Sequence, residues 1–296
     1  MEYQHHSDEK NNFSDAFKTG IALNVTFVIL EILFGFFSNS MSLIADAGHN
    51  FSDVLALVFS WIAIRLSQSR PTHRFTYGFR RSTILIALLN TIILVIAMLF
   101  LLIETISRLG KPIEINSTSV IIVALIGIAV NGFTAWLFFK GKSHDLNIRS
   151  AFVHFVADTL VSLGVVVGGV LMFYTGLYWI DSVVSFAVIA VILFSTFKLL
   201  IDTVSLALDA VPGDIDIGAV RSYLESLSGV TGIHDLHIWA LSTNVVALTV
   251  HIQTDDPADL SFINQVQNQL KERFSIEHTT IQIEYGDQGN GCNDCN

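Results

Sequence analysis

The sequence predicts a membrane protein with six transmembrane helices and a small C-terminal α+β domain in the cytoplasm. The composition is one reason, because the 296 residues are 52% hydrophobic and only 14% charged, whereas soluble domains carry about 25% charged residues. A second reason is that six long apolar stretches fill residues 17–203. The third is a change after Pro212-Gly213, where shorter alternating and helical patterns replace the apolar stretches.

Each of the six stretches is long enough to cross a bilayer, which takes about 20 residues of helix. The second and the fifth are the least purely apolar. Three glycines in the fifth stretch, Gly164, Gly168 and Gly169, are typical of helices that approach a neighbour closely. We place the spans at residues 17–37, 41–66, 82–107, 118–140, 147–174 and 179–203.

The distribution of basic residues predicts that both termini lie in the cytoplasm, where membrane proteins concentrate lysine and arginine. The loops opposite the N-terminal side contain only Arg108 and Lys111. The N-terminal side contains Lys10, Lys18, Arg65, Arg70, Arg74, Arg80, Arg81, Lys140, Lys142 and Arg149. Residues 1–16 are polar and do not resemble a cleavable signal peptide.

The chain from residue 209 onward is acidic and has the pattern of a small mixed domain. It holds 13 Asp/Glu and 3 Lys/Arg, which accounts for the whole net charge of −10, and such a domain repels nucleic acid. Helical spacing at 217–227 and 260–274 and alternation at 233–241, 245–254 and 279–284 predict the order αββαβ. The predicted parts are an N-terminal cytoplasmic segment (1–16), a six-helix domain (17–208), the mixed domain (209–285) and a tail (286–296).

Two identically spaced pairs of ionisable residues lie inside the apolar stretches. His49 and Asp53 are four residues apart in the second span, and His154 and Asp158 repeat this spacing in the fifth. On a helix, both side chains of such a pair project from one face. An ionisable group inside a membrane costs roughly 2.5–3.5 kcal/mol, so it usually faces a protein interior or a water path. Two imidazoles and two carboxylates together make a complete tetrahedral shell for zinc.

A single pair of this kind has a simpler explanation, since a histidine and an aspartate one turn apart can form a hydrogen-bonded lock between helices. The recurrence of the pair in two separate spans favours metal binding. Asp46 lies two turns before Asp53 on nearly the same face, where it either lines the route to the site or supports a ligand. The asparagines within the spans, Asn24, Asn90 and Asn131, are typical of hydrogen bonds between packed helices.

The mixed domain contains further candidate ligands, the histidines His234, His237, His251 and His278. His234 and His237 are three residues apart on a predicted strand, so we expect them to face opposite sides of the sheet. His251 on the next strand is placed to meet one of them. The only cysteines, Cys292 and Cys295, form a terminal Cys-x-x-Cys, for which metal binding is a more natural use than a disulfide.

Four motifs together resemble the cation diffusion facilitator family: Ala45-Asp-Ala-Gly-His-Asn-Phe-Ser-Asp53, His154-Phe-Val-Ala-Asp158, His234-Asp-Leu-His-Ile-Trp239 and His278-Thr-Thr-Ile-Gln-Ile-Glu284. The resemblance is strongest to the zinc-exporting branch, which comprises bacterial zinc, cobalt and cadmium efflux proteins and animal vesicular zinc transporters. It implies a homodimeric, proton-coupled exporter with six membrane helices and a cytoplasmic domain similar to metallochaperones.

The resemblance also implies roles for single residues. The transported ion would be bound by His49, Asp53, His154 and Asp158. Zinc in the cytoplasmic domain would be bound by His234, His251, His278 and Glu284. Cys292 and Cys295 would complete a zinc shell with the N-terminal segment of the other protomer, for which His5 and His6 are suitable. A disordered tail or an artefact of expression is the alternative for these terminal residues. An interlock between Arg81 and Asp209 is also implied.

Two imidazole ligands favour zinc and cobalt over magnesium, calcium and manganese, and we expect cadmium, which is softer and larger, to be accepted less readily. The predicted function is export of Zn2+ from the cytoplasm in exchange for protons, in the inner membrane of a bacterium. The alternative is a membrane metal sensor or metalloenzyme that holds zinc statically. An enzyme is not expected, because the sequence has no His-Glu-x-x-His and four protein ligands leave no position for a reactive water.

Overall fold

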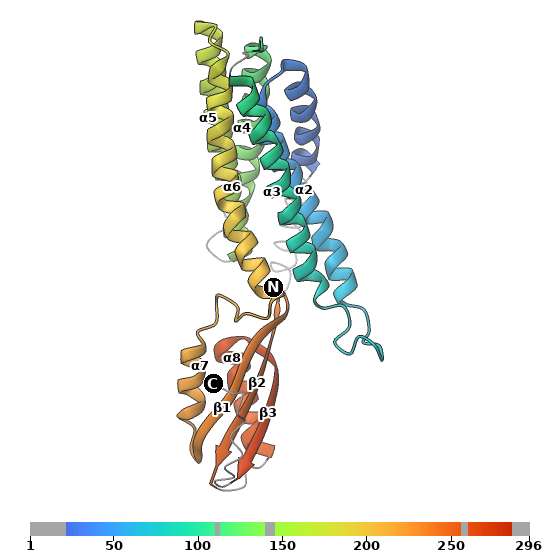
Figure 1. The fold of residues 1–296 in the computed structure, drawn as a ribbon, viewed down its shortest axis with the longest axis vertical. Helices are drawn as coiled ribbons and strands as arrows, with labels where there is room; N and C mark the ends of the chain where they lie inside the picture. The colour runs from blue at the N-terminus through green and yellow to red at the C-terminus, as the bar shows by residue number, and fades with distance from the viewer. Residues whose placement is uncertain (1–21, 110–112, 140–145, 256–259, 286–296) are drawn as a thin grey trace, which may run out of the picture. The chain divides into compact units, whose positions relative to one another are not determined.

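The computed structural model describes residues 22–109, 113–139, 146–255 and 260–285. These residues form long helices up to Ala207 and a smaller α+β domain after them (Figure 1). By its contacts the chain divides into two compact units. The first comprises the chain up to Val58 together with Asn90–Lys198, and the second comprises Phe59–Leu89 together with the chain from Leu199 onward.

The described chain contains six helices before the C-terminal domain. Four regions are long and apolar enough to cross a membrane: Ser82–Leu109, Ser117–Leu137, Phe152–Thr175 and Trp179–Ala207. Ala22–Ser38 is a shorter apolar helix. The labelled helices are α2 Met41–Ser67, α3 Ser82–Leu109, α4 Ser117–Phe139, α5 Leu146–Thr175 and α6 Trp179–Ala207. The prediction of a helical membrane domain is confirmed.

Glycines in α5 allow close contact with neighbouring helices at two of the three predicted positions. A Cβ at Gly168 would lie 2.5 Å from Val184 Cγ2 of α6, and a Cβ at Gly169 would lie 2.8 Å from Ile121 Cγ1 of α4. Carbon atoms do not approach this closely, so both contacts depend on the absence of a side chain. A Cβ at Gly164 would meet no atom of a neighbouring described helix within 4 Å, so the prediction of a close contact there is wrong.

The beginning of α2 is anchored to α6 by one buried carboxylate. Asp181, in the first turn of α6, is 2% exposed and accepts hydrogen bonds from the hydroxyls of Ser40 and Ser42, each at 2.6 Å. It also accepts from the backbone N–H of Met41 at 2.7 Å. A carboxylate at a helix N-terminus pairs with free N–H groups and lies at the positive end of the helix dipole. Asp181 therefore fixes the start of the helix that contains the first His/Asp pair.

The C-terminal domain is a three-stranded sheet with two helices packed on one face. Its elements are α7 Ile217–Glu225, β1 Val230–Ser242, β2 Val245–Thr254, α8 Leu260–Phe274 and β3 Ile276–Tyr285, which confirms the order αββαβ (Figure 1). The central strand β2 is antiparallel to β1 and parallel to β3. Leu248, Val250 and Ile252 alternate along β2 and pack in one core with residues of both helices. His251 lies between them in the sequence, so its side chain points to the other face.

A bulge in β1 decides where two histidines point. His234 pairs with His251 and His237 pairs with Thr249, so β1 advances by three residues while β2 advances by two. Asp235 lies within the bulge with a positive φ of 53°, a conformation that aspartate adopts more readily than most residues. Because Thr249 and His251 share one face of β2, His234 and His237 share that face of the sheet. The prediction that they face opposite sides is wrong, since it assumed a regular strand.

Candidate metal centre

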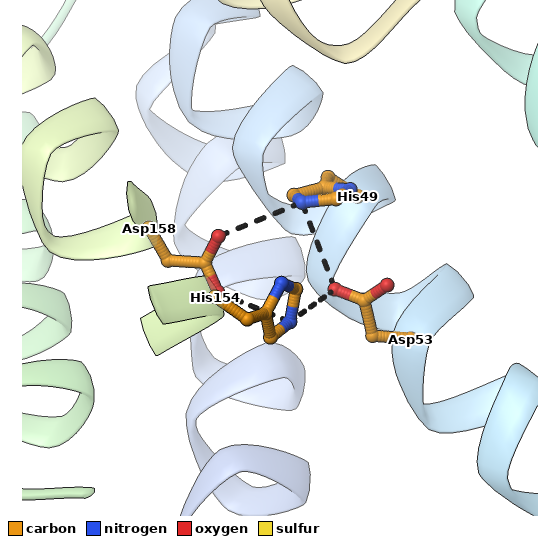
Figure 2. Close-up of side chains that lie close together, drawn as sticks. All are labelled: His49, Asp53, His154 and Asp158. Carbon is orange, nitrogen blue, oxygen red and sulfur yellow. Dashed lines mark ion pairs between the residues drawn. The ribbon is translucent and has the colours of Figure 1, made fainter. Parts of the chain in front are cut away.

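The two His/Asp pairs come together within the first unit. His49 and Asp53 lie on α2, and His154 and Asp158 lie on α5. The two residues of each pair are one helical turn apart, so their side chains point to the same side of the helix. Figure 2 shows the four side chains pointing toward one another from the two helices. One ligand atom from each residue lies within 4.8 Å of the other three.

Histidine nitrogens and carboxylate oxygens alternate around this cluster (Figure 2). His49 Nε2 lies 3.7 Å from Asp53 Oδ2 and 3.6 Å from Asp158 Oδ1. His154 Nε2 lies 3.3 Å from Asp53 Oδ2 and 3.4 Å from Asp158 Oδ2. Ligands placed tetrahedrally about 2.0–2.3 Å from an ion lie about 3.3–3.7 Å from one another, and zinc bonds to nitrogen and oxygen measure about 2.0–2.2 Å. The four nitrogen–oxygen distances are therefore those expected around a tetrahedral zinc ion.

The side chains of the cluster differ in their exposure. The side chain of Asp158 is 6% exposed and that of His49 is 18% exposed, whereas those of Asp53 and His154 are 36% and 41% exposed. Asp53 Oδ2 and His49 Nδ1 are buried atoms that have no hydrogen-bond partner among the described residues. A cation bound to Asp53 Oδ2 would supply the missing partner of this oxygen.

Asp46, which the sequence suggested either lines the route to the site or supports a ligand, lies outside the cluster. It is 1% exposed and is not one of the four residues whose ligand atoms converge. Ser162 Oγ of α5 donates a hydrogen bond to Asp46 Oδ2 at 3.2 Å. Asp46 therefore connects the two helices that contain the cluster.

A second group of possible ligands lies on the sheet of the C-terminal domain. His234 Nε2 is 3.4 Å from Glu284 Oε2, and His251 Nδ1 is 2.9 Å from Glu284 Oε1. The ring centroids of His234 and His251 are 5.0 Å apart, so the expected meeting of His251 with a histidine of β1 is confirmed. The ligand atoms of these three residues lie within 4.8 Å of one another. Three ligands leave a fourth tetrahedral position for water or for another side chain.

Asp235, which the sequence reasoning did not single out, lies beside this group. Its Oδ1 is 2.7 Å from His237 Nε2, and its Oδ2 is 3.5 Å from His251 Nε2. A carboxylate that contacts the second nitrogen of a ligating histidine fixes the orientation and the tautomer of the ring. The position of Asp235 between two histidines was visible in the sequence, but its approach to His251 depends on the bulge.

His278, a further predicted ligand, is not brought into either group. The ring of His278 is not part of the three-residue group and lies 5.5 Å from the ring of Tyr77, edge to face. His5, His6, Cys292 and Cys295 lie outside the described residues. The predicted interlock is confirmed, because Arg81 forms an ion pair with Asp209.

Both parts of the chain match one family of known proteins. The family description "cation efflux transmembrane domain" matches residues 18–206. The description "cation efflux protein, cytoplasmic domain" matches residues 212–285. The first match alone covers more than half of the chain, and it includes all four residues of the cluster in the membrane domain.

Bacterial relatives resemble the chain over most of their length. It is 32% identical over 264 residues to the cadmium, cobalt and zinc/H(+)-K(+) antiporter of Bacillus velezensis, covering 87% of this chain and 84% of the relative. It is 32% identical over 282 residues to the metal cation efflux system protein CzcD of Cupriavidus metallidurans, covering 95% and 89%. It is 33% identical over 285 residues to the zinc transporter ZitB of Escherichia coli, covering 95% and 90%. The chain therefore belongs to the cation efflux family, also called the cation diffusion facilitator family, whose members are multi-pass membrane transporters.

Proposed function

We propose that this protein exports Zn2+ from the cytoplasm in exchange for protons, that it also accepts Co2+, and that it accepts Cd2+ less readily. The observation that carries the proposal is the cluster of two imidazole nitrogens and two carboxylate oxygens between two helices of the membrane domain. The names of the relatives support it, because they include an antiporter of cadmium, cobalt and zinc and a zinc transporter. His49, Asp53, His154 and Asp158 bind the metal as cargo.

Protons and metal ions compete for the atoms of this cluster. Zinc binds to neutral imidazole and to ionised carboxylate, and the usual pKa values of these groups are about 6.5 and about 3.9. A fall in pH therefore weakens metal binding, and a rise in pH strengthens it. The cluster takes up zinc when it faces the near-neutral cytoplasm and releases it when it faces a more acidic exterior. The bound protons then return to the cytoplasm as the cluster turns inward.

Exchange of this kind requires that the cluster open to each side of the membrane in turn. Rocking of the helices α2 and α5 against the other helices would achieve this around a fixed binding site, as in other secondary transporters. The concentration of basic residues on the N-terminal side supports a location of both termini in the cytoplasm, in a bacterial inner membrane. Antibody access to a tag at either terminus, in intact and in opened cells, tests this orientation.

The C-terminal domain is proposed to join two copies of the chain and to bind regulatory zinc through His234, His251 and Glu284. The closeness of these three ligands supports the metal site, and the match to the cytoplasmic domain of cation efflux proteins supports the domain's role. Zinc held here adjusts transport without being transported. The terminal residues His5, His6, Cys292 and Cys295 remain candidates for a further shared zinc site.

Transport in reconstituted vesicles tests the main proposal. Purified protein is placed in lipid vesicles that enclose one dye sensitive to zinc and another sensitive to pH. We expect entry of zinc to be accompanied by exit of protons, to be faster when the vesicle interior is acidic, and to slow when a protonophore collapses the gradient. Zinc entry without proton movement would point to a channel. Zinc binding without any flux would favour the alternative of a static metal sensor or metalloenzyme.

A further inference from the structure

A pair of buried carboxyl groups lies outside the four-residue cluster of the candidate metal centre. Glu31, in the helix Ala22–Ser38, is 0% exposed, and Asp46 in α2 is 1% exposed. Asn50, whose Nδ2 lies 3.0 Å from Glu31 Oε2, follows Asp46 by one turn of α2, so both carboxyl groups lie beside the same part of that helix. Neither residue belongs to the group of four whose ligand atoms converge. The structure therefore holds two neighbouring acidic side chains that are both shielded by protein.

The donors around this pair are too few for two ionised groups. Asn50 Nδ2 donates to Glu31 Oε2 at 3.0 Å, and Ser162 Oγ donates to Asp46 Oδ2 at 3.2 Å. The other two oxygens, Glu31 Oε1 and Asp46 Oδ1, are buried and have no hydrogen-bond donor among the described residues. Two neighbouring carboxylates do not both ionise in such a setting, because each charge opposes the other and burial opposes both. A single proton between them would supply the missing donor.

We propose that Glu31 and Asp46 share one proton in the metal-free protein, and that arrival of a divalent cation at the four-residue cluster displaces this proton. The pair is then a second proton-binding site of the exporter. It adds one proton that the four metal ligands do not hold. This inference rests on the proposed exchange of metal for protons.

The pair is connected to the metal cluster through both helices that contain it. Asp46 precedes His49 by three residues, Asn50 follows His49 directly, and Ser162 follows Asp158 by one helical turn. Among the described residues, the charged groups that act on the pair from α2 and α5 are His49 and Asp158. A cation bound between these two residues makes the surroundings of the pair more positive. Positive charge favours the ionised form of both carboxyl groups, so the shared proton leaves when the metal binds.

The test is a count of the protons that the full-length protein releases when it binds Zn2+. Wild-type protein, Glu31→Gln and Glu104→Gln are each titrated with Zn2+ in detergent, in weakly buffered solution with a pH indicator. Glu104→Gln makes the same chemical change at a side chain of α3 that is 51% exposed. Glutamine supplies a donor to Asp46 but cannot release a proton. The metal sites of the C-terminal domain are the same in all three proteins, so their contribution cancels.

We expect Glu31→Gln to release about one proton fewer per chain than the wild type, because metal binding displaces protons from the groups that it affects. We expect Glu104→Gln to release as many protons as the wild type. We also expect Co2+ bound to Glu31→Gln to keep the visible absorption of the wild-type complex, since the four ligands are unchanged. Equal proton release by Glu31→Gln and the wild type would overturn the proposal.

Two further measurements decide the case in which Glu31→Gln does not fold. Asp46→Asn removes the other half of the pair and should lower the proton release by a similar amount. In the wild type, infrared difference spectra should show the carbonyl stretch of a protonated carboxylic acid disappear when Zn2+ is added. If this band persists when Zn2+ is bound, the proposal that metal binding releases the shared proton is refuted. A failure of the proposed exporter function would be seen in a different experiment. It would appear as absent or uncoupled zinc flux in vesicles, whatever number of protons the protein releases when it binds Zn2+.

Discussion

In the proposed metal site, each of the four residues of the cluster would contribute either charge or selectivity. Asp53 and Asp158 together supply two negative charges, which neutralise a divalent cation that has lost its water. His49 and His154 supply nitrogen atoms, which favour zinc and cobalt over ions that prefer oxygen. Because the carboxylates come from different helices, loss of either one leaves the cation half neutralised and bound mainly to one helix.

Asp158→Asn is expected to abolish transport. Asp158 is the most buried of the four side chains, so the loss of its charge cannot be made good by water. Loss of a residue that merely supports a metal ligand lowers metal affinity about 10–100-fold, and loss of a direct ligand should exceed that. Zinc flux in vesicles measures the effect. Asp202→Asn, at an exposed aspartate of α6, is the control and should transport normally. Near-normal flux in Asp158→Asn would remove Asp158 from the site.

His49→Asp is expected to widen the selectivity toward Mn2+. The change replaces a nitrogen ligand by a carboxylate oxygen, which discriminates less against ions that prefer oxygen. Competition of each metal with zinc uptake measures the change. His73→Asp, at an exposed histidine between α2 and α3, is the control with the same substitution. Competition curves that match the wild type would argue that His49 does not bind the transported ion.

At the scale of helices, close packing and capping hold the ligands in place. α5, which contains His154 and Asp158, touches α6 at Gly168 and α4 at Gly169. α2, which contains the other two ligands, begins at the carboxylate of Asp181 on α6. The distance between the two ligand pairs is therefore decided by contacts some distance along the helices from the cluster.

Gly168→Ala is expected to destabilise the protein, and Gly164→Ala is not. The new methyl group at Gly168 would overlap Val184, and overpacking typically costs about 1–3 kcal/mol. At Gly164 the described structure has room for it, and alanine favours a helix by roughly 1 kcal/mol over glycine. Thermal unfolding of the two purified variants in the same detergent compares them directly. A lower melting temperature for Gly164→Ala than for Gly168→Ala would contradict the described packing of α5.

At the scale of the whole molecule, the charge is concentrated in the C-terminal part of the chain. Residues 209–296 contain the entire net charge of −10, whereas the rest of the chain is neutral. Two such domains would repel each other in the proposed dimer, and cations bound to them would reduce the repulsion. His234, His251 and Glu284 offer one place for such a cation.

Zinc is therefore expected to strengthen association of the full-length protein, and a chelator is expected to weaken it. His251→Ala should reduce this response, because His251 contributes to the three-residue group and contacts Asp235 as well. His278→Ala should retain it, since His278 of the same chain is not part of that group. Light scattering of the protein in detergent, with and without zinc, measures the association. Loss of the response in His278→Ala would show that His278 completes the site in the dimer.

Much of this architecture follows from local sequence patterns. Hydropathy over about 20 residues is a property of each stretch alone, so the helical membrane domain could be predicted without knowledge of the packing. Alternation and helical spacing likewise predicted the order αββαβ. The spacing of four within His49/Asp53 and within His154/Asp158 was enough to predict that each pair shares a helix face. These predictions needed no contact between distant residues.

Only the tertiary structure decided how distant residues meet. The alternating 3.3–3.7 Å contacts of the metal cluster depend on the rotation and separation of α2 and α5, which no local pattern specifies. The same holds for the buried hydrogen bond that Asn50 of α2 donates to Glu31, which joins two helices. In the sheet, the bulge at Asp235 reverses the predicted direction of His237 relative to His234. Strand register is settled by pairing with a second strand, and one extra residue turns every later side chain to the opposite face.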